Sequence, residues 1–447
     1  MTEITGHPGA PGVPEITQQQ RTEVTLVPEV TEEQRTSPRI SARDFFIYLG
    51  PALIISLAFL DPGCLATDIA AGAGFNYNLI WSLVMASMFA ILLQYLSGKL
   101  GIATGNSVSQ LVRTSLKTKS RIIPYWLGAE LAIAVTDLSE YMGTVIALNL
   151  LFGIPLLYAS FLAAADVLIL LVLSNGRFRI VEYAFMFFVS VISIGFLYEL
   201  AIVGFNPAQV VIHTFTPTIS QDSILIIVGI IGATVMPHTL WLHSGLTAEK
   251  KKRWGIKDSD ELPKKKLLRL HTRETLLILV GAMIVNVSVL VAAAAAFYPQ
   301  YNIQQFSDAY NVLKPLFGPL AATVFAIGIL ASGISASTCG TLAGQEVMTS
   351  LLGIKVNRYL RRIVTRGINV FPVTILLLLG LSPFAILVYT QVVLSLMIPL
   401  PMIPIVWYTT RSKLMGSFVN SRTTSIIAVA VAVTLIILNA VLISTYF

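Results

Sequence analysis

Eleven apolar stretches, each long enough to cross a bilayer as a helix, constrain this chain more than any other feature. A transmembrane helix needs about 20 predominantly apolar residues. Only 12% of the 447 residues are charged, against roughly 25% in a soluble domain. The sequence therefore predicts an all-α, polytopic membrane protein with eleven transmembrane helices. The expected spans are 46–70, 79–98, 125–152, 154–173, 181–203, 222–246, 274–297, 315–345, 361–381, 384–408 and 424–446.

Charge and composition set the expected boundaries and orientation. Residues 1–42 are polar and rich in Pro, Thr, Glu and Gln, which predicts a disordered tail before a transmembrane domain at 43–447. With a cytoplasmic N-terminus and an extracellular C-terminus, every one of the 30 Lys and Arg residues except Lys314 falls on the cytoplasmic side. The net charge of +7 then reflects topology and contact with membrane lipid, and no nucleic-acid partner is expected.

Two of the stretches are interrupted by proline near their middles. The first reads Asp61-Pro62-Gly63-Cys64 and the sixth reads Met236-Pro237-His238-Thr239. A proline inside a helix removes one donor and frees the carbonyl four residues earlier, here those of Ala58 and Ala233. Hydrocarbon tolerates such backbone only inside protein or along a cavity. Interruptions at corresponding places in two halves indicate the substrate site of a transporter.

The groups at these breaks are suited to a metal cation. Asp61 offers a carboxylate, Met236 a thioether, Cys64 a thiol, and Ala58 and Ala233 offer carbonyl oxygens. Sulfur ligands favour transition ions over Mg²⁺ or Ca²⁺. The structural alternatives are that Asp61 caps the second half-helix and that Met236 fills the core.

Three acids follow one another in the third expected span. Glu130, Asp137 and Glu140 are seven and three residues apart, so they share one helix face. Ionisable groups at membrane depth are functional candidates, and a row of acids is typical of a proton or ion relay. The alternative is a structural network with Arg361 and Arg362 at the start of the ninth span, which is compatible with proton transfer.

Three further polar side chains lie inside apolar stretches. His238 follows Pro237 directly and is a candidate for a proton role, although a histidine in a membrane often only hydrogen-bonds a neighbouring helix. The same alternatives apply to His243, for which the packing role is favoured. Gln391 in the tenth span either completes a coordination shell or bonds another helix. No nucleophile–base arrangement or phosphate-binding loop suggests an enzyme.

These residues together resemble the Nramp family of proton-coupled divalent-metal transporters. The likeness runs from about Gly50 to the C-terminus and rests on several ordered motifs. They are Asp61-Pro62-Gly63, Ala66-Thr67-Asp68, Gly101-Ile102-Ala103-Thr104-Gly105, Thr136-Asp137-Leu138-Ser139-Glu140, Gly232-Ala233-Thr234-Val235-Met236-Pro237-His238, Leu242-His243-Ser244, Ala331-Ser332-Gly333 and Gln391-Val392-Val393.

The resemblance implies a LeuT-like fold. Its two inverted repeats would occupy about 46–203 and 222–408, with the first and sixth helices broken and an extra helix at 424–446. It also implies proton-coupled import of Mn²⁺ or Fe²⁺ across the plasma membrane by alternating access, with the metal ion as substrate and no cofactor.

The resemblance also assigns residues to roles. The metal ligands would be Asp61, Met236, Ala58 and Ala233, joined by Gln391 in some conformations. The proton pathway would use Glu140, Asp137 and His238, with Arg361 or Arg362 at its cytoplasmic end. Glu130 joins it as the third acid of the row formed with Asp137 and Glu140, which is called the acid stripe below.

Cys64 departs from the family pattern, in which the first break usually reads Asp-Pro-Gly-Asn. A neutral oxygen ligand is replaced by a soft, ionisable thiol, which favours a shift from Mn²⁺ toward Fe²⁺, Zn²⁺ or Cd²⁺. Retention of Met236 argues against the Mg²⁺-carrying branch of the family. Two alternatives remain open: a carrier of another substrate on the same fold, and a metal sensor that transports nothing.

Overall fold

The regular elements of the computed structural model are all helices within the residues that it describes. Those are 50–56, 61–165, 204–298 and 321–446, together with the single positions 45, 48, 58, 59, 187, 190, 191, 193–195 and 198. The predicted tail at 1–42 and most of the stretches 166–203 and 299–320 lie outside the described residues. The prediction of an all-α protein is confirmed.

The helices used below have the following bounds. They are α4 (Pro51–Ser56), α5 (Pro62–Phe75), α6 (Ile80–Thr104), α7 (Val108–Leu116), α8 (Lys119–Phe152), α9 (Leu156–Leu162), α12 (Pro207–Phe215), α13 (Ile224–Val235), α14 (Pro237–Arg253), α15 (Glu261–Phe297), α18 (Ala321–Leu352), α19 (Arg358–Leu378), α20 (Pro383–Met397), α21 (Pro399–Thr409), α22 (Ser412–Met415) and α23 (Arg422–Tyr446).

Seven stretches of the described residues are helical, long and apolar enough to cross a membrane. They contain the second, third, sixth, seventh, tenth and eleventh expected spans, the second half of the first, and the eighth from Phe325 onward. The ninth expected span is present as α19, whose first turns carry Arg361, Arg362 and Arg366. The fourth and fifth expected spans extend into residues outside the described ranges.

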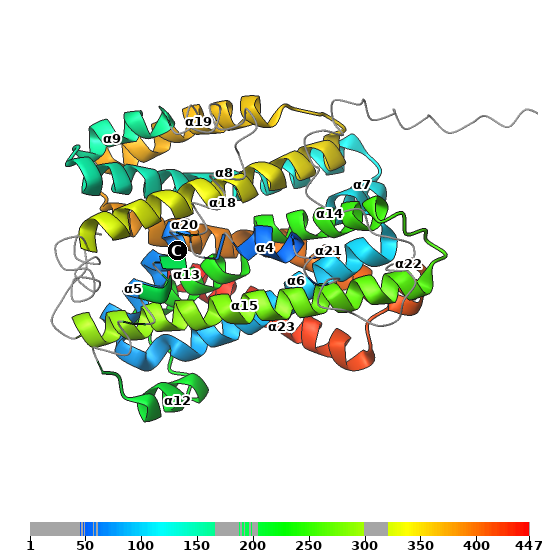
Figure 1. The fold of residues 1–447 in the computed structure, drawn as a ribbon, viewed down its shortest axis with the longest axis horizontal. Helices are drawn as coiled ribbons and strands as arrows, with labels where there is room; N and C mark the ends of the chain where they lie inside the picture. Colours follow the sequence, from blue (N-terminus) through cyan, green and yellow to red (C-terminus); the bar gives the residue numbers. More distant parts are fainter. Residues whose placement is uncertain are drawn as a thin grey trace, which may run out of the picture.

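Both predicted helix breaks are present, and the two broken helices cross in opposite directions. The first helix is divided into α4 and α5, and the sixth into α13 and α14. α4 contacts α14, whereas α5 contacts α13, so the first half of each broken helix packs on the second half of the other (Figure 1). The crossing brings both non-helical segments to one place inside the helix bundle.

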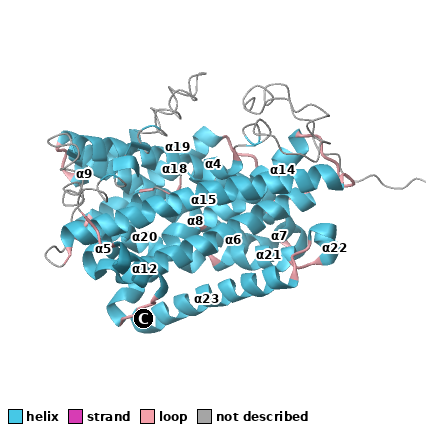
Figure 2. Cartoon of the chain, turned by 60° about the horizontal axis from the view of Figure 1, so that its bottom comes forward, coloured by secondary structure: helices cyan, strands magenta, loops and turns pink. Residues whose placement is uncertain are grey.

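The remaining helices enclose this crossing and separate the two ends of the molecule. α15, α20 and α8 all contact α5, and α18 packs along α8. α23 lies along the outside against α21 and α6 (Figure 2). α7 and α22 lie at one end and α12 at the other (Figure 1), which agrees with the expectation that their loops face opposite sides of the membrane.

Candidate metal centre

The first break is built by an N-cap on α5. Asp61 has an extended backbone (φ −67°, ψ 162°), and its carboxylate accepts a hydrogen bond from the backbone N–H of Cys64 at 2.5 Å. Pro62 occupies the first helical position, where the missing N–H would be unpaired in any case. The capping role considered for Asp61 is therefore present, and it fixes a buried carboxylate, 2% exposed, at the break.

The second break lies at Met236, a residue other than glycine. α13 ends at Val235, and Met236 adopts φ 47° and ψ 97° before Pro237 starts α14. A positive φ is strained for a residue other than glycine. Two hydrogen bonds hold it: Met236 N–H donates to the Gly232 carbonyl at 3.3 Å, and the Met236 carbonyl accepts from Thr239 N–H at 3.2 Å. The break therefore presents a buried thioether where the helix is unwound.

The Cys64 thiol joins the two breaks. Its sulfur lies 3.1 Å from the carbonyl oxygen of Ala233 and 3.9 Å from that of Ala58. The Ala58 carbonyl also accepts Asp61 N–H at 3.2 Å, so it is not wholly freed by Pro62. The structure thus brings the predicted carboxylate, thiol and two carbonyls together, with Met236 at the adjoining break.

Gln391 approaches the first break from α20. Its amide nitrogen donates to Ser139 Oγ on α8 at 3.0 Å, while its buried Oε1 has no hydrogen-bond partner within the described part of the chain. A Cβ on Gly63 would lie 2.6 Å from the Gln391 amide carbon and 2.7 Å from Ser139 Oγ. Glycine at 63 is therefore what allows the Gln391 amide to lie over the α5 backbone.

The acid stripe of α8 divides into an outer pair and an inner pair. Glu130 forms an ion pair with Arg361. Asp137 and Glu140 are buried, and Asp137 Oδ1 and both Glu140 carboxylate oxygens lack hydrogen-bond partners among the described residues. A Cβ on Gly340 of α18 would lie 2.8 Å from Asp137 Oδ1, so that glycine makes room for the inner pair. Such unpaired buried oxygens are rare and indicate a functional or water-linked site.

Arg366 is the member of this network that the sequence reasoning missed. Its side chain is 1% exposed, and its guanidinium donates to the Asp137 carbonyl at 3.4 Å and to Ser337 Oγ at 3.1 Å. The guanidinium also lies 5.3 Å over the Tyr141 ring. Arg366 lies inside the ninth expected span and one turn after Arg362, which is itself buried. The rule for ionisable groups in mid-membrane would have found it.

His238 contacts α8 at Thr136, the residue before Asp137. Its Nδ1 lies 3.1 Å from Thr136 Oγ1, and that hydroxyl donates its only proton to the Ala132 carbonyl at 3.0 Å. The second ring nitrogen, His238 Nε2, is buried and has no hydrogen-bond partner in the described ranges.

His243 is connected to the second break through side chains. The Thr239 hydroxyl donates to the Met236 carbonyl at 2.8 Å, so it accepts from the Gln94 amide at 2.6 Å. The Gln94 oxygen then accepts from His243 Nδ1–H at 2.9 Å. Each group in this chain donates to the next, from the buried His243 imidazole through Gln94 and Thr239 to the Met236 carbonyl at the break.

Comparison with solved structures defines the class of protein. The structure of Mhp1, a nucleobase-cation-symport-1 family transporter, in a closed conformation matches 88% of both chains with a TM-score of 0.58 and 14% identity, which shows the fold alone. The chain is thus a polytopic membrane protein of the LeuT-like fold.

Closer relatives define the family. The model of the family described as "Nramp: Natural resistance-associated macrophage protein-like" matches residues 52–445, and the chain belongs to this family. The divalent metal cation transporter MntH of Acidiphilium cryptum is 38% identical over 92% of this chain and 93% of its own length. That of Bacillus subtilis is 34% identical over 91% and 93%. The crystal structure of the Eremococcus coleocola manganese transporter in complex with an aromatic bis-isothiourea substituted compound has a TM-score of 0.80 at 28% identity, covering 95% of this chain and 91% of that one.

Proposed function

We propose that this protein imports divalent transition metal ions, Mn²⁺ or Fe²⁺ and also Cd²⁺ or Zn²⁺, together with H⁺, by alternating access across the plasma membrane. The observation that carries the proposal is the Cys64 thiol between the carbonyls of Ala58 and Ala233, beside the Asp61 carboxylate. The names of the relatives, divalent metal cation transporter and manganese transporter, support the same substrate class.

The donor set matches what a partly dehydrated transition ion requires. Asp61 supplies negative charge, which a cation leaving water needs. The two carbonyls replace water oxygens, and Gln391 Oε1 is a further unpaired acceptor near the same break. The sulfurs of Met236 and Cys64 favour softer ions over Ca²⁺ and Mg²⁺.

The proton route that we propose runs along α8 from the metal site. Glu140 and Asp137 hold unpaired carboxylate oxygens, and His238 Nε2 also lacks a hydrogen-bond partner in the described part of the chain. Arg366 fixes the α8 backbone at Asp137 and keeps a positive charge beside both acids. The Glu130–Arg361 ion pair would form the cytoplasmic end, so a proton entering at His238 has successive acceptors along one helix face.

Transport by the purified full-length chain in liposomes tests this function. We expect inward movement of Mn²⁺ driven by an inward proton gradient, and competition by Fe²⁺, Cd²⁺ and Zn²⁺ but not by Mg²⁺ or Ca²⁺. Met236→Leu retains size and removes the sulfur, so it should weaken competition by Cd²⁺ far more than uptake of Mn²⁺. Met88→Leu is a matched control, because Met88 is 62% exposed.

Three outcomes would contradict the proposal. Metal binding without any uptake would indicate a sensor. Metal uptake at a rate that does not depend on the proton gradient would rule out coupling to H⁺. Failure of every divalent ion to bind would indicate a carrier of another substrate on this fold.

A further inference from the structure

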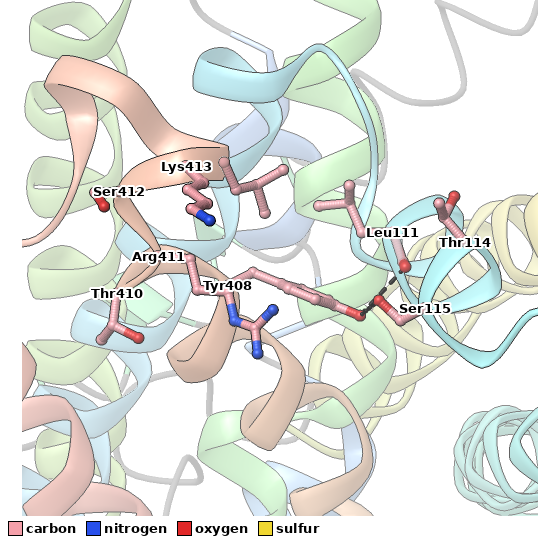
Figure 3. Close-up of a pocket in the computed structure, with 9 residues that line it drawn as sticks. Leu111, Thr114, Ser115, Tyr408, Thr410, Arg411, Ser412 and Lys413 are labelled. Atoms are coloured by element: carbon pink, nitrogen blue, oxygen red, sulfur yellow. Dashed lines mark hydrogen bonds between the residues drawn. The ribbon is translucent and has the colours of Figure 1, made fainter.

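A cavity unrelated to the metal centre opens at the end of the molecule that carries α7 and α22. Its volume is about 560 Å³, and it lies between α7 and the segment from the end of α21 through α22. Figure 3 shows the Tyr408 side chain reaching from α21 toward Ser115 of α7, with Arg411 and Lys413 near it. Two parts of the chain about 300 residues apart therefore form its walls.

The scaffold of the cavity is fixed by a buried tyrosine. Tyr408 is 5% exposed, and its hydroxyl hydrogen-bonds to Ser115 Oγ at 2.7 Å and to the Leu111 carbonyl at 3.2 Å. These bonds hold the end of α21 against α7. Hydrogen bonds between the two walls therefore fix the shape of the cavity.

The charge of the lining is positive and uncompensated. Arg411 and Lys413 are exposed, and neither forms an ion pair within the described part of the chain. No Asp or Glu is among the lining residues, which otherwise include hydroxyl groups such as those of Thr114 and Ser115. The Arg411 guanidinium and the Lys413 ammonium can both donate charge-assisted hydrogen bonds, and two such cations without a neighbouring carboxylate favour a phosphate.

The aromatic side chains beside the cavity indicate its depth in the membrane. Trp407 is 48% exposed at the end of an apolar span, which is typical of residues at the headgroup level. Its ring stacks on Tyr408 with centroids 5.5 Å apart, and the Arg411 guanidinium lies 3.8 Å over it. The guanidinium is therefore held at the membrane–water boundary, beside lipid.

We propose that this cavity binds the phosphate-bearing headgroup of an anionic phospholipid. The position of Arg411 on an exposed tryptophan favours a lipid over a soluble phosphate, because the site opens next to the bilayer surface. The absence of acidic groups from the lining favours an anionic headgroup over a zwitterionic one, whose ammonium group would need a partner. A bound headgroup would stabilise the contact between α7 and α21.

Native mass spectrometry of the full-length chain in detergent, titrated with phosphatidylglycerol, tests the proposal. The double variant R411Q/K413Q should bind the lipid roughly 30-fold more weakly, since each basic residue near an anionic lipid contributes about a fivefold gain. K252Q/R269Q is the matched control, because both side chains are exposed and neither lines the cavity. That control should bind the lipid as the parent does.

A second variant separates shape from charge. Thr114 is exposed and lines the cavity, so Thr114→Trp should fill the space and reduce binding while both cations remain. Two results would overturn the proposal. One is that K252Q/R269Q loses as much phosphatidylglycerol binding as R411Q/K413Q does. The other is that the parent binds phosphatidylcholine as tightly as phosphatidylglycerol. Displacement of the lipid by millimolar inorganic phosphate or glycerol 3-phosphate would assign the site to a soluble phosphate instead.

Discussion

The sulfur of Cys64 lies 3.1 Å from the carbonyl oxygen of Ala233, so a side chain of the first broken helix bonds directly to the backbone of the sixth. In the metal site that we propose, this carbonyl and the sulfur are both ligands. A metal ion that binds the sulfur as a thiolate would displace the thiol proton, which would link metal binding at the crossing to proton release.

Replacing Cys64 with Asn should change the selectivity of the site. We expect Cys64→Asn to retain or improve Mn²⁺ uptake, to bind Cd²⁺ at least tenfold more weakly, and to release fewer protons per Cd²⁺ bound. Calorimetry in buffers of different ionisation heat counts those protons. Cys339→Ser is the control, since this second thiol is buried in α18. The same proton count and Mn²⁺:Cd²⁺ preference in Cys64→Asn and the parent would mean that Cys64 only packs.

The charge and the cap of Asp61 can be separated by two substitutions. Asn caps a helix as well as Asp does, whereas Ala costs about 1 kcal/mol of stability. Asp61→Asn should thus keep the Tm of the parent and lose Mn²⁺ uptake to the background of empty liposomes. Asp61→Ala should lose both. Uptake near the parent level in Asp61→Asn would refute the role of its charge.

Neutralising Glu140 should affect proton movement more than metal binding. Glu140→Gln preserves size and hydrogen-bonding groups and removes the titratable proton, so metal-driven acidification of liposomes should fall at least tenfold while Mn²⁺ affinity stays within a few-fold. Glu249→Gln is the control, because the Glu249 side chain is 54% exposed. Acidification that is unchanged in Glu140→Gln would place the proton path elsewhere.

A methyl group at position 63 should displace Gln391. Gly63→Ala would place a Cβ against the Gln391 amide and Ser139 Oγ, so we expect a loss of Tm and of metal affinity corresponding to about 1–3 kcal/mol of overpacking. Gly74→Ala, in the same helix, meets nothing within 4 Å and should be neutral. In a Gln391→Ala background the effect of Gly63→Ala should shrink. Full additivity of the two substitutions would contradict the contact.

The helix breaks and the carbonyls beside them could be predicted from the sequence because proline acts locally. Pro62 and Pro237 predict which carbonyls lose their donors, and Ala233 does receive the Cys64 thiol instead. The Ala58 carbonyl differs, since a turn places Asp61 N–H within 3.2 Å of it. Turn geometry of this kind, like the positive φ at Met236, depends on tertiary contacts that no local pattern encodes.

The arginine partners of the acid stripe were harder to assign. The sequence places Arg361 and Arg362 near the acids, yet which arginine faces which acid depends on the rotation of α19 against α8. In the structure Arg361 pairs with Glu130, and Arg366 hydrogen-bonds the backbone carbonyl of Asp137. Helical periodicity identifies a shared face within one helix, but it does not fix how two helices are turned toward each other.

Asp61 gives the start of α5 an unusual property. The oxygen that accepts Cys64 N–H belongs to the carboxylate that we propose as the counter-charge of the metal. An arriving cation would compete with the backbone for that oxygen and would weaken the hold on the first turn. In the site that we propose, metal binding would therefore loosen the first turn of α5 directly, and no other residue would be needed to pass the signal to this helix.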